Sequence, residues 1–113
     1  MAKQKHLLVA LTNCKPGTDA EFNKWYDGTH IPDILSIRLF TAAQRFERSL
    51  DYTGTLPPYL AIYEVEADSP EEARAALQAM RETNPAFLGD TLDLGGTLAA
   101  FYAPLSDKVV ADS

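Results

Sequence analysis

Residues 59–66 read YLAIYEVE, and this stretch decides the fold of the 113-residue chain. β-Branched and aromatic residues are concentrated in it, which predicts a β-strand. Apolar side chains alternate onto both faces of the predicted strand: Tyr59, Ala61, Tyr63 and Val65 on one, Leu60 and Ile62 on the other. Because helices in a small α+β domain cover only one face of the sheet, the second apolar face needs another cover.

Helices and strands follow on both sides of residues 59–66 in a recognisable order. Ser69, a capping serine followed by proline and two acids, starts a helix that Asn84-Pro85 ends. The predicted elements are strand 5–12, helix 18–28, helical turn 31–36, strand 40–48, strand 59–66, helix 69–84 and strand 98–103. This is the order of the ferredoxin-like βαββαβ fold, an α+β fold with a four-stranded antiparallel sheet and two helices on one face.

Local signals refine the first half of the chain. Thr18 and Glu21 form a predicted capping box at the start of the first helix. Gly28 is placed to close that helix in a left-handed conformation. In residues 40–48, strict alternation puts two groups on opposite faces: Phe40, Ala42, Gln44 and Phe46 on one, Thr41, Ala43, Arg45 and Glu47 on the other.

The apolar pattern also predicts an assembly. In the first strand Leu7, Val9 and Leu11 alternate with Leu8 and Ala10, so this strand too is apolar on both faces. An uncovered apolar face marks an interface. The economical cover is a second copy, in a two-fold homodimer whose sheets pack face to face into a barrel. We expect one domain over residues 1–113, with an ordered core of 5–104 and a loose tail at 105–113.

The composition argues against several partners. The formal net charge is −6 and the ten Lys and Arg residues are scattered, which disfavours nucleic acid and anionic membranes. Cys14 is the single cysteine, so an internal disulfide and a thiolate metal site are not expected. Residues 1–5 are polar and no segment approaches a membrane span, so the expected location is the reducing cytoplasm.

Residues 21–33 (EFNKWYDGTHIPD) are the candidate site. Phe22, Trp25 and Tyr26 recur at helical spacing, and His30 and Asp33 follow. Large rings, an imidazole and a carboxylate thus gather around one helix end, where a small-molecule pocket can form.

The pattern of residues 21–35 (EFNKWYDGTHIPDIL), followed by AAQRF at 42–46 and the YLAIYEVE strand, resembles the dimeric α/β-barrel superfamily, in particular its EthD-like branch. The resemblance covers roughly residues 5–104. It implies the ferredoxin-like dimeric barrel and an activity such as polyketide cyclisation, cofactor-free oxygenation, dehydration or haem degradation. In plant polyketide cyclases of this superfamily, a histidine at the place of His6 faces the pocket.

His30 is the leading catalytic candidate. A histidine titrates near neutrality and serves as a general acid or base, with a contribution of about 10²–10⁴-fold. Asp33, one helical turn further on, would orient the ring or hold its proton. The alternative is that His30 caps the carbonyls of the preceding helix.

Trp25, Tyr26 and His6 are candidate substrate-binding residues. Aromatic residues at helical spacing are usually core, so we expect one of Trp25 and Tyr26 to be core and the other to border the cavity. His6 meets the same cavity if it points inward, but we favour the outward orientation, at a strand end. We expect no metal site, because two histidines are too few.

Tyr63 and Arg45 are the polar groups expected to project into the interior. A buried tyrosine hydroxyl needs a hydrogen-bond partner, and an inward arginine can hold a carboxylate or an enolate. The alternative for Arg45 is an ion pair with Glu64 on a neighbouring strand.

These residues favour a homodimeric enzyme with one small apolar pocket per subunit for an aromatic or polyketide-like substrate. Without any cofactor, His30 would move the proton, Asp33 would set its tautomer, and Tyr63 or Tyr26 would stabilise an oxyanion during cyclisation, dehydration or isomerisation. One alternative is a cofactor-free oxygenase, with haem degradation as a weaker version. Another is a non-catalytic binding protein or accessory subunit. Whether the 86–96 connection forms a lid stays open.

Overall fold

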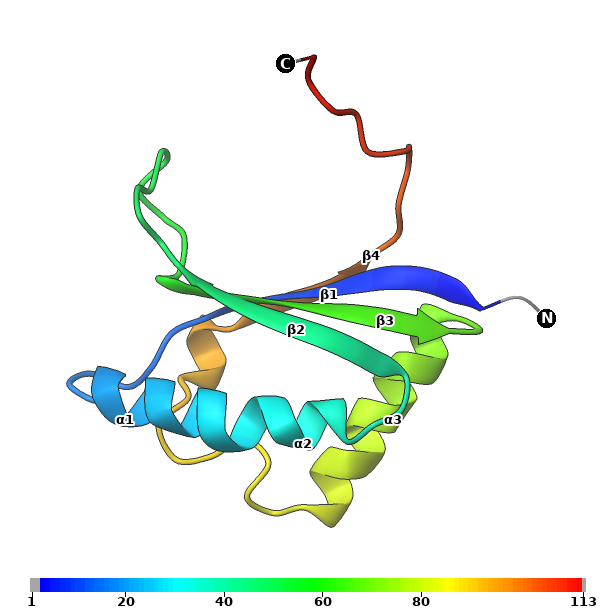
Figure 1. Cartoon of the computed structure of the whole chain (residues 1–113). Coiled ribbons are helices and arrows are strands. Elements are labelled where there is room, and N and C mark those ends of the chain that lie inside the picture. The colour runs from blue at the N-terminus through cyan, green and yellow to red at the C-terminus, as the bar shows by residue number, and fades with distance from the viewer. Residues whose placement is uncertain (1–2, 113) are drawn as a thin grey trace.

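The computed structural model describes residues 3–112 and shows a four-stranded sheet with helices on one face (Figure 1). The strands lie in the order β2-β3-β1-β4, and each neighbouring pair is antiparallel. Their bounds are β1 (Gln4–Thr12), β2 (Phe40–Glu47), β3 (Tyr59–Ala67) and β4 (Leu98–Tyr102). This topology is the ferredoxin-like βαββαβ fold, so the predicted fold class is confirmed.

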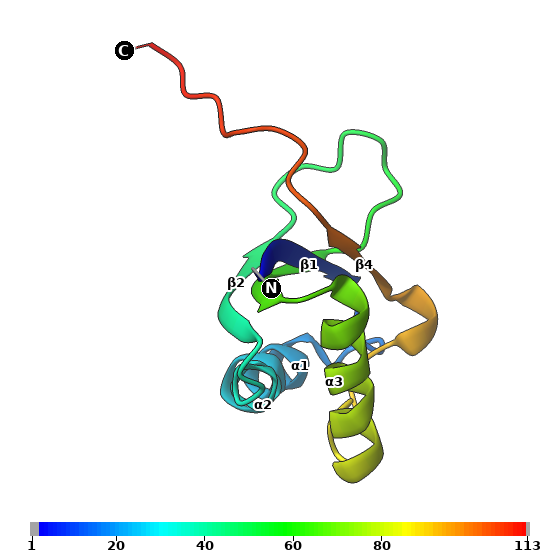
Figure 2. The ribbon, with the colours of Figure 1, turned by 90° about the vertical axis from the view of Figure 1, so that its right-hand side faces the viewer.

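The helices cover one face of the sheet as two units that lie side by side (Figure 2). One is a continuous rod formed by α1 (Asp19–Trp25), the π-helical turn η1 (Tyr26–His30) and α2 (Ile31–Leu35). The other is α3 (Pro70–Thr83), which runs away from the sheet toward its C-terminal end in both views. A 3₁₀ turn, η2 (Leu94–Gly96), leads into β4. Within residues 3–112, none of the helices combines the length and the apolar character that crossing a bilayer requires.

The rod continues at the point where the sequence predicts a helix end. Gly28 does not have a positive φ, so the predicted left-handed closure is wrong. Instead, the Ile31 N–H donates to the Tyr26 carbonyl five residues earlier, which is the hydrogen bond of a π-helix.

The π turn has a packing consequence. The buried residues of the rod recur every four positions: Phe22, Tyr26, His30 and Ile34. In an α-helix of 3.6 residues per turn, each step of four drifts by about 40°, so three steps would carry Ile34 about 120° off the line. The wider turn takes back part of this drift and keeps the four side chains on the inner side.

The predicted helix starts differ in outcome. The Ser69 hydroxyl accepts a hydrogen bond from the Glu72 N–H at 3.2 Å, so the predicted capping serine is confirmed. The Thr18 hydroxyl instead donates to the Lys15 carbonyl at 2.7 Å and makes no cap bond. The predicted capping box at the first helix is therefore wrong.

A β-bulge changes the faces predicted for β2. Phe40 pairs with Val65 while Ala42 pairs with Glu64, so Thr41 is the extra residue. Phe40 therefore lies on the helix-covered face and is 3% exposed, whereas Phe46 lies on the opposite face and is 42% exposed. Strict alternation, which groups the two phenylalanines, is wrong at this position.

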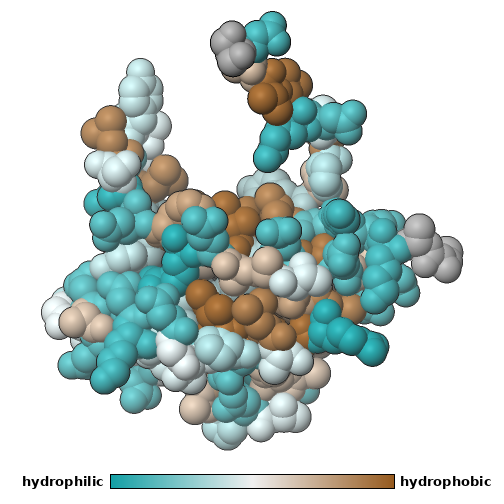
Figure 3. Space-filling view, in the orientation of Figure 1, coloured by the Kyte–Doolittle hydropathy of each residue, from teal (hydrophilic) through white to brown (hydrophobic). Residues whose placement is uncertain are grey.

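The two faces of the sheet are both apolar, as the sequence predicts, and the helices cover one of them. The uncovered face presents mostly apolar side chains: Leu7, Val9, Leu11, Ala42, Phe46, Leu60, Ile62, Leu98 and Tyr102. Figure 3 shows apolar surface along this upper side of the sheet. The 48–58 segment and the 103–112 segment both rise on this side, away from the helices (Figure 1).

Candidate functional site

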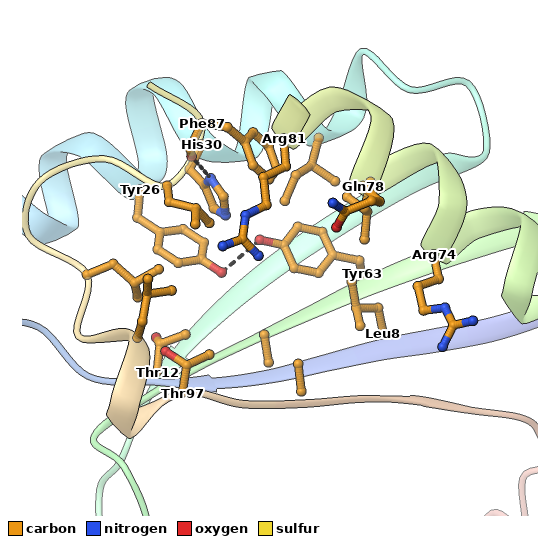
Figure 4. Close-up of a pocket in the computed structure, with 17 residues that line it drawn as sticks. Leu8, Thr12, Tyr26, His30, Tyr63, Arg74, Gln78, Arg81, Phe87 and Thr97 are labelled. Carbon is orange, nitrogen blue, oxygen red and sulfur yellow. Dashed lines mark hydrogen bonds between the residues drawn. The ribbon is translucent and has the colours of Figure 1, made fainter. Parts of the chain in front are cut away.

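A pocket of about 290 Å³ lies between the covered face of the sheet, the rod, α3 and the connection that follows α3 (Figure 4). Leu8, Ala10 and Thr12 of β1 and Tyr63 of β3 form its floor, and Leu88, Leu92 and Leu94 come from the connection. The volume is close to the lower limit of small-molecule pockets, about 300 Å³. The pocket is mostly apolar, with a few polar groups converging on it.

His30 enters the pocket from η1 and is neutral there. Its side chain is buried, and burial lowers the pKa of the imidazole to about 4. The Phe87 carbonyl lies 3.0 Å from Nδ1. Because a carbonyl oxygen only accepts, Nδ1 carries the hydrogen and Nε2 keeps a lone pair. Figure 4 shows this second nitrogen turned toward the pocket, where it makes no hydrogen bond with residues 3–112.

Aromatic rings fix the orientation of the imidazole. Trp25 stacks on His30 with ring centroids 4.6 Å apart and an interplanar angle of 27°. Tyr26 and Phe87 each place a ring centroid 4.8 Å from that of His30. Gly89, with φ +66°, lies so close to Trp25 that a Cβ atom there would be 2.5 Å from the indole. The indole is thus held between the imidazole and the connection after α3.

Tyr26 and Tyr63 form a hydroxyl pair in the pocket. Their oxygens are 2.8 Å apart, and the bond joins the rod to the centre of the sheet. Burial raises the pKa of Tyr63 and also the pKa of Tyr26, so both hydroxyls keep their protons. Two hydroxyls have two hydrogens and the mutual bond uses one, which leaves one donor for a ligand.

Of the two predicted wall residues, Tyr26 lines the pocket and Trp25 lies behind His30. One of the two residues borders the cavity, as expected, but Tyr26 is both that residue and a core residue, whereas Trp25 is only partly buried. Tyr63 also projects inward, and its predicted need for a partner is met by Tyr26.

Arg45 lies behind the Tyr26 ring and does not line the pocket. Its guanidinium carbon is 4.3 Å from the centroid of that ring. Nη1 donates to the Asp27 carboxylate at 3.0 Å and Nη2 donates to the Asn23 amide oxygen at 2.8 Å. The prediction that Arg45 projects into the interior to bind substrate does not match this position, and the alternative pairing with Glu64 is not found either. Arg45 supports Tyr26 from outside the cavity.

Asp33 and His6 also lie differently from the prediction. The Asp33 carboxylate accepts from the Asn84 amide at 3.3 Å, and the Phe87 carbonyl takes the place at His30 that Asp33 was expected to fill. His6 is buried on the helix-covered face, so the favoured outward orientation is wrong. It still does not line the pocket, and its buried Nδ1 has no hydrogen-bond partner within residues 3–112.

Sequence reasoning missed the contribution of α3. Arg74, Gln78 and Arg81 lie at positions i, i+4 and i+7 and form the exposed rim of the pocket. The signal that could have found them is their place beside the apolar stripe of that helix. In the part of the chain described, no three His, Cys, Asp or Glu side chains form a group that could hold a metal ion.

Sequence comparison finds no protein-family model and no curated protein that matches this chain. Similar solved structures do exist. An EthD family protein from Bacillus halodurans C-125 has a TM-score of 0.61 at 18% identity, covering 89% of this chain and 99% of its own. A DABB family protein with a ferredoxin-like fold from Mesorhizobium loti has a TM-score of 0.61 at 14% identity, covering 91% and 99%.

A third similar structure contains a ligand. It is a monooxygenase from Streptomyces coelicolor in complex with nanaomycin D, with a TM-score of 0.56 at 15% identity, covering 96% of this chain and 94% of its own. Likeness at these identities shows a shared fold. The resemblance predicted from residues 21–35 is thus confirmed at the level of the fold, which this chain shares with an EthD family protein and with a DABB family protein of ferredoxin-like fold.

Proposed function

We propose that this chain is a small-molecule enzyme that acts on an aromatic or polyketide-like substrate by acid–base chemistry without a cofactor. The observation that carries the proposal is a neutral His30 whose free Nε2 faces the same pocket as the tyrosine pair. A base and a hydroxyl donor in one apolar pocket are the groups needed to move a proton next to a carbonyl.

The positions of these groups support one proton-transfer scheme. Nε2 of His30 accepts a proton from the substrate carbon next to a carbonyl group, while the free hydroxyl hydrogen of the tyrosine pair stabilises the resulting enolate. A pKa of about 4 makes His30 a weak base, so its substrate must have a proton already acidified by a carbonyl group. Burial disfavours the imidazolium, so His30 returns the proton within the cycle. This favours cyclisation, dehydration or isomerisation, in which no net proton is lost.

The test makes the same substitution, histidine to glutamine, at two positions. Wild type, His30→Gln and His6→Gln are incubated with 1,3-dicarbonyl polyketide mimics and phenolic ketones in D₂O, and deuterium uptake and products are followed by mass spectrometry. We expect His30→Gln to lose about 10²–10⁴-fold in rate, the contribution typical of a general base. His6→Gln should keep its rate, because His6 does not line the pocket.

Two outcomes contradict the proposal. Equal rates in wild type and His30→Gln would remove His30 from the reaction. Compounds that raise the melting temperature of wild type but are never exchanged or converted would indicate a non-catalytic binding protein instead.

A cofactor-free oxygenase is the second candidate, favoured by the shared fold with a monooxygenase bound to nanaomycin D. In that reaction the carbanion formed by proton loss to His30 reacts with dioxygen. A CH₂ group becomes C=O and the second oxygen atom leaves as water. Dioxygen consumption equal to product formation would select this reaction, and conversion under anaerobic conditions would exclude it.

We also propose that two copies associate through the uncovered face of the sheet. On this face Leu98 is 59% exposed and Tyr102 is 58% exposed, and apolar surface of this kind is rarely left to solvent. Light scattering should give twice the 12.4 kDa chain mass for wild type and the single mass for Leu98→Glu. A single mass for wild type at micromolar concentration contradicts the proposal. The proposed compartment remains the cytoplasm, on the ground of the single cysteine.

A further inference from the structure

The charged side chains that line the pocket have one sign. Among the residues that the structure describes, no Asp or Glu lines the pocket. Because His30 is neutral, the charges of the pocket are those of Arg74 and Arg81. The whole chain carries a formal charge of −6. The cationic lining is therefore a local feature that opposes the overall charge, and such a feature selects anions.

Arg81 is a cation at the exposed rim of the pocket. It extends from the last turn of α3, and in Figure 4 it lies across the mouth of the pocket in front of Tyr26 and Tyr63. Within residues 3–112 Arg81 has no ion pair, as is also true of Arg38 and Arg74, whereas Arg45 and Arg48 each have an acidic partner. The helix dipole favours a cation in a last turn. The dipole does not account for the position of this guanidinium at the rim of an apolar pocket.

We propose that the substrate of this pocket carries a carboxylate, and that Arg81 binds it at the rim. This rests on the proposed function and names its substrate class. A planar guanidinium binds a carboxylate through two parallel hydrogen bonds, while the apolar body of the molecule fills the cavity lined by Leu8, Ala10 and Leu92. One guanidinium suits a monoanion better than a phosphate, because Arg74 points to the other end of the pocket (Figure 4).

The contact between Arg81 and the substrate carboxylate, here called the carboxylate anchor, also positions the reacting group. With the carboxylate held at the rim, the substrate carbonyl is the group left to meet the tyrosine hydroxyls, and its neighbouring proton meets Nε2 of His30. Arg81 is thus a specificity-determining residue and takes no part in proton transfer.

The test compares p-ethylbenzoate with its neutral isostere p-ethylbenzamide by isothermal titration calorimetry. Wild type, Arg81→Gln and the control Arg38→Gln are used; Arg38 is exposed and lines none of the pockets described. We expect Arg81→Gln to bind the acid at least about tenfold more weakly, because glutamine carries no charge and cannot form the pair of charge-assisted hydrogen bonds. Amide binding should not change, and Arg38→Gln should match wild type. Added salt should weaken the acid alone.

Other outcomes overturn the proposal in distinguishable ways. Equal affinity of wild type for acid and amide, or equal loss in the Arg81 and Arg38 variants, removes the carboxylate anchor and leaves the proposed function intact. Tighter binding of p-ethylphenyl phosphate than of the acid assigns a different anion. If neither acid nor amide binds wild type, the pocket is not a site for aromatic molecules, and the proposed function fails with the anchor.

Discussion

The rod and α3 cover the same face of the sheet in different ways. The rod buries Phe22, Tyr26, His30 and Ile34, all at most 7% exposed, whereas α3 buries Ala73 alone. Rings that interlock with the sheet hold the imidazole and the tyrosine hydroxyl rigidly. The helix that packs lightly leaves space beneath it and lines that space with long cationic side chains. Close packing thus accompanies the proposed proton transfer, and loose packing accompanies the proposed recognition.

The largest expected effect tests this contrast directly through stability. Phe22→Ala in the rod should lower the free energy of unfolding by about 4 kcal/mol, because Phe22 is fully buried among Trp25, Tyr26 and Tyr59. Leu77→Ala in α3 should cost only about 1–2 kcal/mol, because Leu77 is half-buried and borders the pocket. Urea unfolding of both variants checks the difference. Equal losses would mean that the rod and α3 contribute equally to the free energy of unfolding.

The next effect concerns acid stability. The pKa of His30 is lowered from 6.5 to about 4 by burial, so the unfolded chain binds more protons between these values. The stability due to neutral His30 is fully present above pH 6.5 and is lost as the pH falls to 4, a change of about 3 kcal/mol. The difference in unfolding free energy between wild type and His30→Gln should change by this amount across that window. A difference independent of pH would show that His30 titrates normally.

A smaller effect is expected where the connection after α3 meets the rod. Gly89→Ala should cost about 2 kcal/mol, from the positive φ and from the contact of the new Cβ with Trp25. Gly54→Ala is the matched control, with φ +84° and nothing within 4 Å of the added Cβ, and should cost about 1 kcal/mol. Thermal unfolding checks both variants. Equal shifts in melting temperature would mean that the connection after α3 moves away from Trp25 without loss of stability.

The smallest effect concerns hydroxyl groups that join the rod to β3. Tyr63→Phe leaves the Tyr26 hydroxyl without its partner and should cost about 1 kcal/mol. Tyr59→Phe removes an exposed bond to Asp19 and should cost about 0.5 kcal/mol. Chemical denaturation, fitted with one m-value for all variants, separates the two losses in unfolding free energy. A larger loss for Tyr59→Phe would contradict the greater weight given to the buried Tyr26–Tyr63 bond.

The strands and their two apolar faces could be predicted because period-two patterns depend on local sequence. The bulge at Thr41 and the π turn at Tyr26–His30 could not, because each depends on how neighbouring elements pack. His30 was found from its residue type and position. Its real partner is the Phe87 carbonyl, 57 residues away, and every residue has a backbone carbonyl. Arg81 was missed for a similar reason, since only the packing of α3 beside the sheet and the rod brings it to the rim of the pocket.

Trp25 is the single tryptophan of the chain, and its indole stacks on the imidazole of His30. An imidazolium accepts an electron from an excited indole and quenches its emission, whereas a neutral imidazole does so far less. The fluorescence of the protein therefore reports the charge on one side chain, with no label and no substrate added. A molecule that delivers a proton to Nε2 would therefore lower the tryptophan fluorescence.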